Sequence, residues 1–362
     1  MRQGKILAAL LALVLCLPLC ACGQEPPERD SVSLWMVADD PLLPRLESLA
    51  AEYNAQREEE LLAVSLRAFP DEAALAAAFD TARPDLLLCS RNRAAALAEQ
   101  DLLRSFRGEE APADPYPAEA HEDFSAVGSA WFPLGARVPL LLAREDAWAA
   151  PSADWNALLT MAADYGAREG LPFFTADSFA ALFRQALAEQ GRTFSADLER
   201  EKGTPAFVTV YNALAEAAYQ GGLLIADSAA VDLVRSGALP CALADTAPAG
   251  LCEGCTWLCL PGADGTRCGQ TEGLALTVRE GRSLQDAAAF LAWLTEPERL
   301  CALALDSGLV PALDDGRQAA DQREALLLSI LRQERLQEPE TAYEENRAAF
   351  ETVFRRAMRQ FP

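Results

Sequence analysis

Between residues 31 and 100, short apolar runs alternate with amphipathic segments, and this order constrains the fold more than any other feature. The apolar runs are SVSLWMV (31–37), LLAVSLRAF (61–69) and RPDLLLCS (83–90). The first two place apolar residues at every second position, which predicts buried strands. The segments that follow the runs have apolar residues three or four apart, as in Leu43, Leu46 and Leu49, and Asp71 is a candidate N-cap. Strand–helix alternation predicts a parallel sheet with crossover helices.

Polar side chains follow two of these predicted strands. Asp39 and Asp40 come after the first, and Ser90, Arg91 and Asn92 come after the third. In parallel sheets, ligands bind beyond the carboxyl ends of the strands, so these loops are candidate ligand contacts. The alternatives are that the two aspartates cap the next helix and that the arginine pairs with a surface acid. The first loop contains no glycine, which disfavours a nucleotide-binding fold.

The rest of the chain is predicted to be mainly helical. A strand is expected at Val138–Leu142, and a glycine-containing block at 250–278 is rich in strand formers. Helices are expected near 154–166, 177–191 and 205–222, then after residue 283, and finally at 322–336 and 340–361. In the last of these, aromatic residues recur at helical spacing, which indicates a buried face.

The N-terminus has the pattern of an export signal. Arg2 and Lys5 precede an apolar run from Ile6 to Leu19, which is shorter than the ~20 residues of a membrane span. The stretch LCAC at 19–22 resembles a bacterial lipobox. That resemblance implies that 1–21 is a lipoprotein signal peptide and that Cys22 carries the lipid, with 22–30 as a tether. The alternative is an ordinary signal peptide with incidental cysteines.

Charge and composition exclude several functions. The formal net charge is −23 and the chain has only two lysines, Lys5 and Lys202, so its field repels nucleic-acid phosphates. The single histidine, His121, argues against a Ser-His-Asp hydrolase and against most catalytic zinc sites. A hydrolase that uses only carboxylates remains open.

The order of several motifs resembles the bacterial extracellular solute-binding proteins of ABC importers, in their maltose-binding-like branch. The motifs are ARPDLLLCS (82–90), LAEQDLLRSF (97–106), WLCLPGADGTRCGQTEGLALTV (257–278) and DAAAFLAWLTEPERLCALALDSGLVPA (286–312). The resemblance implies an α/β, two-lobed periplasmic-binding-protein fold of type II, in which each lobe is a mixed sheet flanked by helices and the ligand cleft lies between the lobes. It places one lobe at 31–132 plus 271–311, and the other at 133–270 plus 312–362.

The resemblance also implies a function. The protein would be a monomer and not an enzyme, without cofactor or metal, anchored by lipid on the extracytoplasmic face of the cell membrane. It would pass a small solute, such as a sugar or oligosaccharide, to the permease subunits. The expected ligand contacts are Asp39, Asp40, Ser90, Arg91, Asn92, Trp131, Arg137, Phe174, Asp177, Trp257, Gln270 and Glu272. Carboxylates and amides suit sugar hydroxyls, arginine suits an anion, and tryptophan offers a stacking face.

Other functions remain open at this stage. With six tyrosines and six tryptophans, the chain has few aromatic faces for stacking on a sugar. The alternatives are a lipoprotein that presents a ligand to a membrane receptor, a cell-surface hydrolase built on carboxylates, and a relative whose cleft binds nothing.

The cysteines downstream of the signal allow three interpretations. Cys241, Cys252, Cys255 and Cys268 are candidates for one or two local disulfides, since thiols outside the cytoplasm tend to pair. Free thiols are the second interpretation. A thiolate metal site is the third, and it is disfavoured because no second paired cysteine motif accompanies CEGC.

Overall fold

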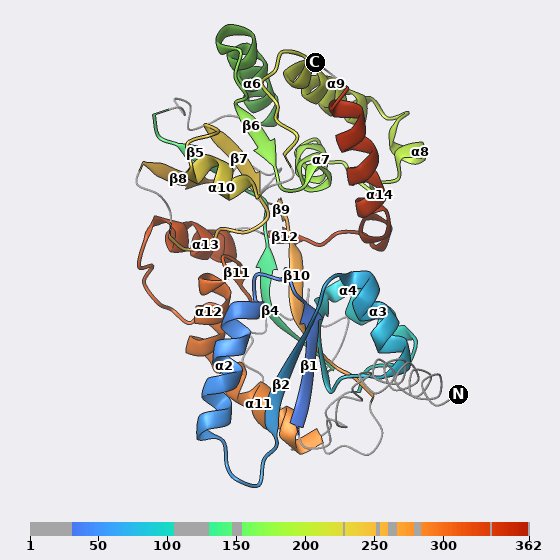
Figure 1. Ribbon diagram of the computed structural model, residues 1–362, viewed down its shortest axis with the longest axis vertical. Coiled ribbons are helices and arrows are strands. Elements are labelled where there is room, and N and C mark those ends of the chain that lie inside the picture. Colours follow the sequence, from blue (N-terminus) through green and yellow to red (C-terminus); the bar gives the residue numbers. More distant parts are fainter. Residues whose placement is uncertain are drawn as a thin grey trace, which may run out of the picture.

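The computed structural model describes residues 31–104, 130–146, 154–226, 229–250, 254–259, 266–278, 284–333 and 335–360. Its helices and strands form two α/β lobes, one above the other in Figure 1, with long strands running from the lower lobe toward the upper one. Cys22 and His121 lie outside the described residues.

The lower lobe is built on a six-stranded sheet in the order β11-β4-β10-β3-β1-β2. The strands are β1 (Ser31–Val37), β2 (Ala63–Phe69), β3 (Leu86–Ser90), β4 (Trp131–Arg137), β10 (Gln270–Leu276) and β11 (Val310–Pro311). β1 pairs in parallel with both β2 and β3, which confirms the parallel arrangement predicted from the alternating pattern. β10 is antiparallel to both β3 and β4, so the sheet as a whole is mixed.

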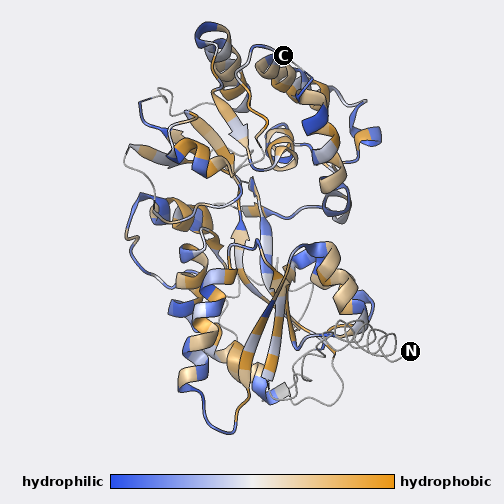
Figure 2. Ribbon diagram, in the orientation of Figure 1, coloured by the Kyte–Doolittle hydropathy of each residue, from blue (hydrophilic) through white to orange (hydrophobic). Residues whose placement is uncertain are grey.

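Helices cover both faces of this sheet. On one face, α2 (Leu43–Gln56), α11 (Leu284–Leu294) and α12 (Pro297–Asp306) enclose an apolar core with Leu34, Leu46 and Phe290. On the other face, α3 (Glu72–Thr81) and α4 (Arg91–Glu99) cover a second core. As predicted, Asp71 caps α3, because its side chain accepts a hydrogen bond from the backbone N–H of Ala74 at 2.7 Å. Figure 2 shows apolar strands in the interior and polar residues on the outer sides of the helices.

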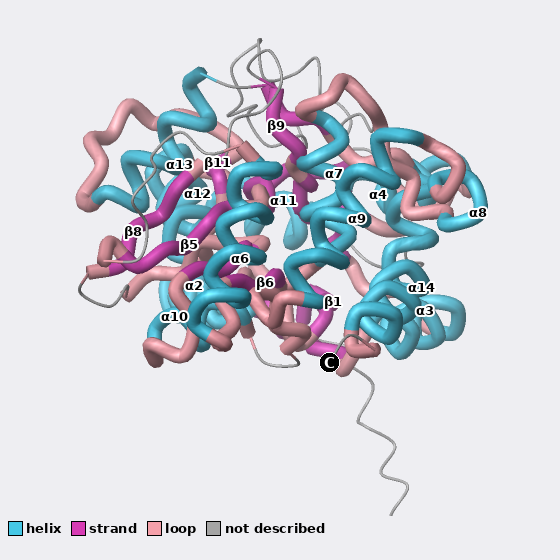
Figure 3. Tube along the Cα trace, turned by 90° about the horizontal axis from the view of Figure 1, so that it is seen from above, coloured by secondary structure: helices cyan, strands magenta, loops and turns pink. Residues whose placement is uncertain are grey.

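The upper lobe is built on a four-stranded sheet in the order β6-β7-β5-β8. Its strands are β5 (Leu140–Arg144), β6 (Phe174–Ala176), β7 (Cys241–Ala244) and β8 (Cys255–Leu258). Its helices are α6 (Trp155–Glu169), α7 (Phe179–Ala188), α8 (Leu198–Glu201), α9 (Pro205–Tyr219), α10 (Ala230–Arg235) and α14 (Thr341–Met358). From above, α6 and α9 lie side by side (Figure 3). Phe183 contacts Phe207, Phe350 and Phe354, so aromatic side chains fix α14 onto this lobe.

Several segments lie at the junction of the lobes. β9 (Thr266–Cys268) and β12 (Arg335–Gln337) form a two-stranded parallel ladder, and α13 (Gln322–Gln333) packs against both β8 and β11. β4 pairs with β10 from Trp131 to Arg137, so the lobe boundary expected at 132/133 falls inside a strand of the lower sheet. The strand expected at Val138–Leu142 is β5, which begins at Leu140 after a proline.

The candidate disulfide cysteines that the structure describes divide between the disulfide and the free-thiol interpretations. Cys241 and Cys268 are buried free thiols, because each is enclosed in packed strands of a different sheet. Burial raises the pKa of both thiols, which disfavours the reactive thiolate. Cys255 is disulfide-bonded, and Cys252 lies outside the described residues.

Candidate ligand cleft

A cleft of about 370 Å³ lies between the carboxyl-terminal edge of the lower sheet and α14 of the upper lobe. Both lobes contribute to its walls. The lining residues are Val37, Asp40, Glu72, Leu75, Phe79, Leu87, Leu88, Cys89, Ser90, Asn92, Arg93, Ala96, Arg137, Gln270, Glu272, Thr341, Glu344, Glu345 and Arg347. The cleft is therefore where ligand contacts were expected from the ends of the parallel strands.

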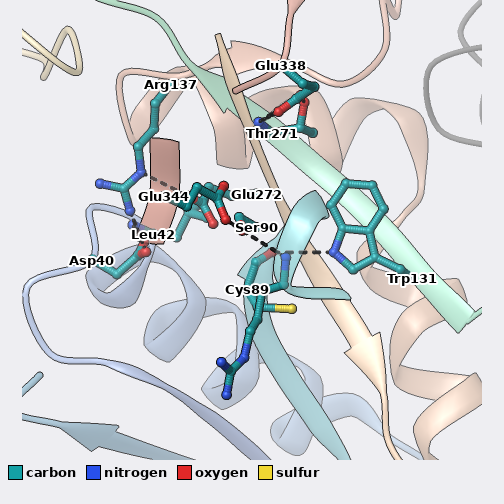
Figure 4. Close-up of polar contacts among 11 residues, drawn as sticks. Asp40, Leu42, Cys89, Ser90, Trp131, Arg137, Thr271, Glu272, Glu338 and Glu344 are labelled. Carbon is teal, nitrogen blue, oxygen red and sulfur yellow. Dashed lines mark hydrogen bonds and ion pairs between the residues drawn. The ribbon is translucent and has the colours of Figure 1, made fainter. Parts of the chain in front are cut away.

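At the wall formed by the lower lobe, one guanidinium bridges two carboxylates (Figure 4). Arg137, the last residue of β4, donates from Nη2 to Asp40 Oδ2 at 2.6 Å and from Nε to Glu272 Oε1 at 3.1 Å. Asp40 also accepts the backbone N–H of Leu42 at 2.8 Å, just ahead of α2. Asp40 thus orders the entry to the helix, as one of its two alternatives predicts, and it also holds the arginine.

The acids around this bridge are crowded, and their pKa values shift accordingly. Burial, together with the nearby Asp40, Glu344 and Glu72, raises the pKa of Glu272 to about 8, although Arg137 opposes the shift. Burial also raises the pKa of Asp40 and of Glu344. Low dielectric and like charges both favour the neutral acid. These carboxyl groups therefore hold a proton more readily than ordinary carboxyls, because the single half-buried guanidinium of Arg137 does not offset their burial and mutual repulsion.

Direct contacts join the two lobes beside the cleft. Ser90 donates from Oγ to Glu344 Oε2 at 3.2 Å, and Asn92 donates from Nδ2 to the carbonyl of Pro339 at 2.6 Å. Thr271 donates its backbone N–H to Glu338 Oε1 at 3.0 Å, and its hydroxyl also contacts that oxygen. Ser90 in addition accepts the N–H of Arg93 as the N-cap of α4. The start of α4 is therefore held to the segment that leads into α14.

The structure brings half of the predicted contact residues to the cleft. Asp40, Ser90, Asn92, Arg137, Gln270 and Glu272 all line it. Asp39 and Arg91 do not, although they flank residues that do. Asp177 lies at the end of β6, where its Oδ1 accepts the backbone N–H of Ala230 at 2.7 Å and so orders the start of α10.

Three predicted aromatic contacts lie in cores instead. Trp131 is 3% exposed and its indole N–H donates to the carbonyl of Cys89, so it packs under the sheet. Phe174 and Trp257 are 0% and 2% exposed in the two cores around the four-stranded sheet. Each sits on a strand whose alternate side chains point inward, so in this structure they offer no stacking face to a ligand. Trp35 is likewise a core residue, and the partly buried Trp293 packs against the core of the lower lobe.

Sequence reasoning missed the residues that α3, α4 and α14 bring to the cleft. These residues are Glu72, Arg93, Thr341, Glu344, Glu345 and Arg347. For α3, the acidic Glu72 in its first turn was the available signal, since the start of a helix that follows a strand of this sheet lies near the same sheet edge. For α14, the sequence gives no indication that it returns to the cleft from the end of the chain.

Among the residues that the structure describes, no group of three or more His, Cys, Asp or Glu side chains has a geometry that could hold a metal ion. No helix in the same ranges has the length and apolar character to cross a membrane.

Comparison with known proteins identifies the family. Residues 49–325 match the bacterial extracellular solute-binding protein family, so the chain belongs to that family. No curated protein matches the sequence.

Solved structures share the fold at low sequence identity. Maltose-bound MalE3 of T. maritima superposes with a TM-score of 0.68 at 14% identity, over 92% of this chain and 95% of that one. The cyclic alpha-maltosyl-1,6-maltose binding protein of Arthrobacter globiformis gives 0.61 at 15% identity, over 92% and 94%. A putative oligosaccharide periplasmic-binding protein of Synechococcus sp. MITs9220, in complex with zinc, gives 0.63 at 18% identity over the same shares. The fold is thus the two-lobed type II fold of periplasmic binding proteins.

Proposed function

We propose that this protein captures a small polar solute of the sugar or oligosaccharide type in the cleft and delivers it to the permease of an ABC importer. The observation that carries the proposal is the composition of the cleft, where carboxylates, amides and arginines from both lobes converge at the sheet edge. Such groups exchange hydrogen bonds with a hydroxylated ligand, and only a closed cleft lets both lobes contact it. The family and the sugar-binding neighbours support the same conclusion.

The proposed work of the protein is binding, without chemistry. A solute that contacts both walls stabilises the closed arrangement by its differential affinity for that arrangement. A permease that recognises the closed form would then accept only the loaded protein. A monomer with a single cleft meets this requirement.

Ligand binding is tested by a thermal-shift screen of the protein against sugars, oligosaccharides and organic acids, followed by calorimetry. A ligand at a hundred times its Kd adds ~2.7 kcal/mol to the unfolding free energy. Gln270→Ala removes a half-buried cleft amide and is expected to weaken binding about tenfold. Gln56→Ala, at an exposed position at the end of α2, is the control. The proposal fails if no solute binds, or if the bound compound is recovered chemically changed.

We also propose that lipid on Cys22 holds the protein at the extracytoplasmic face of the membrane. Two or three acyl chains give firm anchoring, at ~0.8 kcal/mol per buried CH₂. Cys22→Ala should therefore move the protein from the membrane fraction to the soluble fraction. Cys89→Ala, at a buried thiol in β3, leaves the anchor intact and should not. Equal membrane retention of the wild type and the Cys22 variant would contradict the anchor.

A further inference from the structure

The charges that line the cleft are unbalanced. Five carboxylates face it, from Asp40, Glu72, Glu272, Glu344 and Glu345, against three guanidiniums, from Arg93, Arg137 and Arg347. Two of the arginines, Arg93 and Arg347, and two of the acids, Glu72 and Glu345, are exposed to solvent, which leaves three less exposed acids around Arg137. Only Arg137 lies within the acidic wall, and it is shared by two carboxylates.

Glu272 leaves one oxygen for a ligand. The residue is 6% exposed and lines the cleft. Its Oε1 accepts from Arg137, while Oε2 has no hydrogen-bond partner among the described residues. Glu344 shows the same pattern on the opposite wall, since Oε2 accepts from Ser90 and the buried Oε1 has no partner. A buried carboxylate oxygen without a donor is costly, so a donor from the ligand would stabilise the site.

Stacking surfaces are scarce on the same walls. Phe79 is the one aromatic residue among the described lining residues, and it is 4% exposed. Recognition by the described walls therefore depends on polar and charged contacts. Ser90, Asn92, Gln270 and Thr341 add neutral groups that can exchange hydrogen bonds with hydroxyls.

We propose that the solute carries a protonated amine, which the unpaired oxygens of Glu272 and Glu344 receive between the lobes. An ammonium group supplies three donors and a positive charge in one compact unit, and on binding it displaces the proton that burial and the neighbouring acids favour on Glu272. Contact with acids of both lobes also favours closure, because the cation screens the repulsion between the two acidic walls. This inference rests on the proposed function, and it narrows the solute to an amine-bearing one, of amino-sugar or polyamine type.

The test compares probes that differ in charge. Calorimetry on the purified protein uses a β-1,4-glucosamine disaccharide, its di-N-acetylated counterpart, spermidine, maltose and a digalacturonate. We expect the glucosamine disaccharide or spermidine to bind at least about tenfold more tightly than the uncharged sugars. Binding of the amine probe should weaken as salt is raised, because the site is partly open to solvent. Spermidine binding without sugar binding would identify a polyamine as the source of the amine.

Two variants link the effect to the proposed oxygens. Glu272→Gln keeps the shape of the side chain and should weaken the amine probe about tenfold, a larger loss than for any binding of maltose. Glu345→Gln, at an exposed cleft position with no hydrogen bond or ion pair among the described residues, should weaken it by a few-fold without affecting folding. Glu99→Gln, on the exposed end of α4, removes the same charge outside the cleft and should have no effect.

The outcomes separate this inference from the proposed function. Tighter binding of the acetylated disaccharide, maltose or digalacturonate overturns the amine and leaves solute capture intact. Equal loss of the amine probe in Glu272→Gln and Glu99→Gln also overturns it, since the effect would then be one of net charge. Failure of every probe to bind overturns the amine, and the wider screen of sugars, oligosaccharides and organic acids then decides whether the protein captures a solute.

Discussion

Glu272 combines two properties that conflict in an unliganded protein. It is almost fully buried, and it lies beside other acids while sharing its only guanidinium. Burial and these neighbours raise its pKa to about 8. Burial likewise raises the pKa of Glu189 to about 7 and that of Asp245 to about 6. All three carboxyls hold a proton more tightly in the folded chain than in the unfolded one.

The stability of the free protein should therefore fall as pH rises. Between the ordinary carboxyl pKa, about 4.5, and a pKa near 8, the folded state binds more protons than the unfolded state, so the unfolding free energy decreases across that window. Chemical denaturation at about pH 5.5 and about pH 8.5 should show the loss. In Glu272→Gln the loss should be smaller, because that position no longer titrates.

Glu189→Gln serves as the matched comparison for this effect. Its carboxyl lies at the end of α7 in the upper lobe and does not line the cleft. Glu189→Gln should reduce the pH dependence of the unfolding free energy by the contribution of the Glu189 carboxyl. It should leave ligand affinity unchanged. If the unfolding free energy of Glu272→Gln depends on pH as strongly as that of the wild type, the pKa of Glu272 is not raised in the free protein.

At the scale of elements, the upper lobe depends on a close approach of backbone to backbone. Gly222 follows α9 and hydrogen-bonds through its carbonyl to the N–H groups of Phe173 and Phe174, at the start of β6. A Cβ at this position would lie 1.7 Å from the carbonyl oxygen of Ala162 in α6. Neither partner is a flexible side chain, so one of the two helices would have to move.

Gly222→Ala is accordingly expected to destabilise the protein by about 3 kcal/mol. Gly203→Ala is the control, because a Cβ there would meet nothing within 4 Å. Thermal unfolding of the two variants against the wild type measures the difference. If both variants unfold at the same temperature, the backbone of α6 does not approach Gly222 as closely as described.

At the scale of elements, local sequence signals predict several strands and caps but not which side chains reach the cleft. Period-two runs and capping residues are local signals, and they were enough for β1, for the parallel pairing of β1 with β2, and for the cap at Asp71. Whether an aromatic side chain on a strand faces a core or a cleft depends on which layer covers it. That layer is distant in sequence, which is why Trp131 and Trp257 were misplaced.

The sequence did not predict that α14 forms a wall of the cleft, because the position of this helix depends on contacts with residues far away in the chain. α14 is fixed to the upper lobe by phenylalanines near its C-terminal end, and this brings Glu344 and Arg347 to a sheet edge some 250 residues away in the chain. Nothing in its local sequence differs from that of any amphipathic helix. The family resemblance predicted a cleft between lobes, but not which helix closes it.

For the molecule as a whole, hydrogen bonds between the lobes favour the arrangement described here over a more open one. Glu344 on α14 accepts the hydroxyl of Ser90 from the lower lobe at 3.2 Å. Glu344→Ala removes this contact and leaves Ser90 free to cap α4. A hydrogen bond to a charged group contributes about 1.5 kcal/mol or more, so the closed-to-open ratio should fall on the order of tenfold.

Small-angle scattering of the unliganded protein measures this shift as an increase in the radius of gyration. Because no ligand is present, the loss of a carboxylate from the cleft wall does not enter the result. Thr352→Ala, on an exposed turn of the same helix, should leave the radius unchanged, since its hydroxyl bonds only within α14. If Glu344→Ala and Thr352→Ala scatter alike, the Ser90 contact does not hold the lobes together. The charge of the solute would then have to supply the whole driving force for closure.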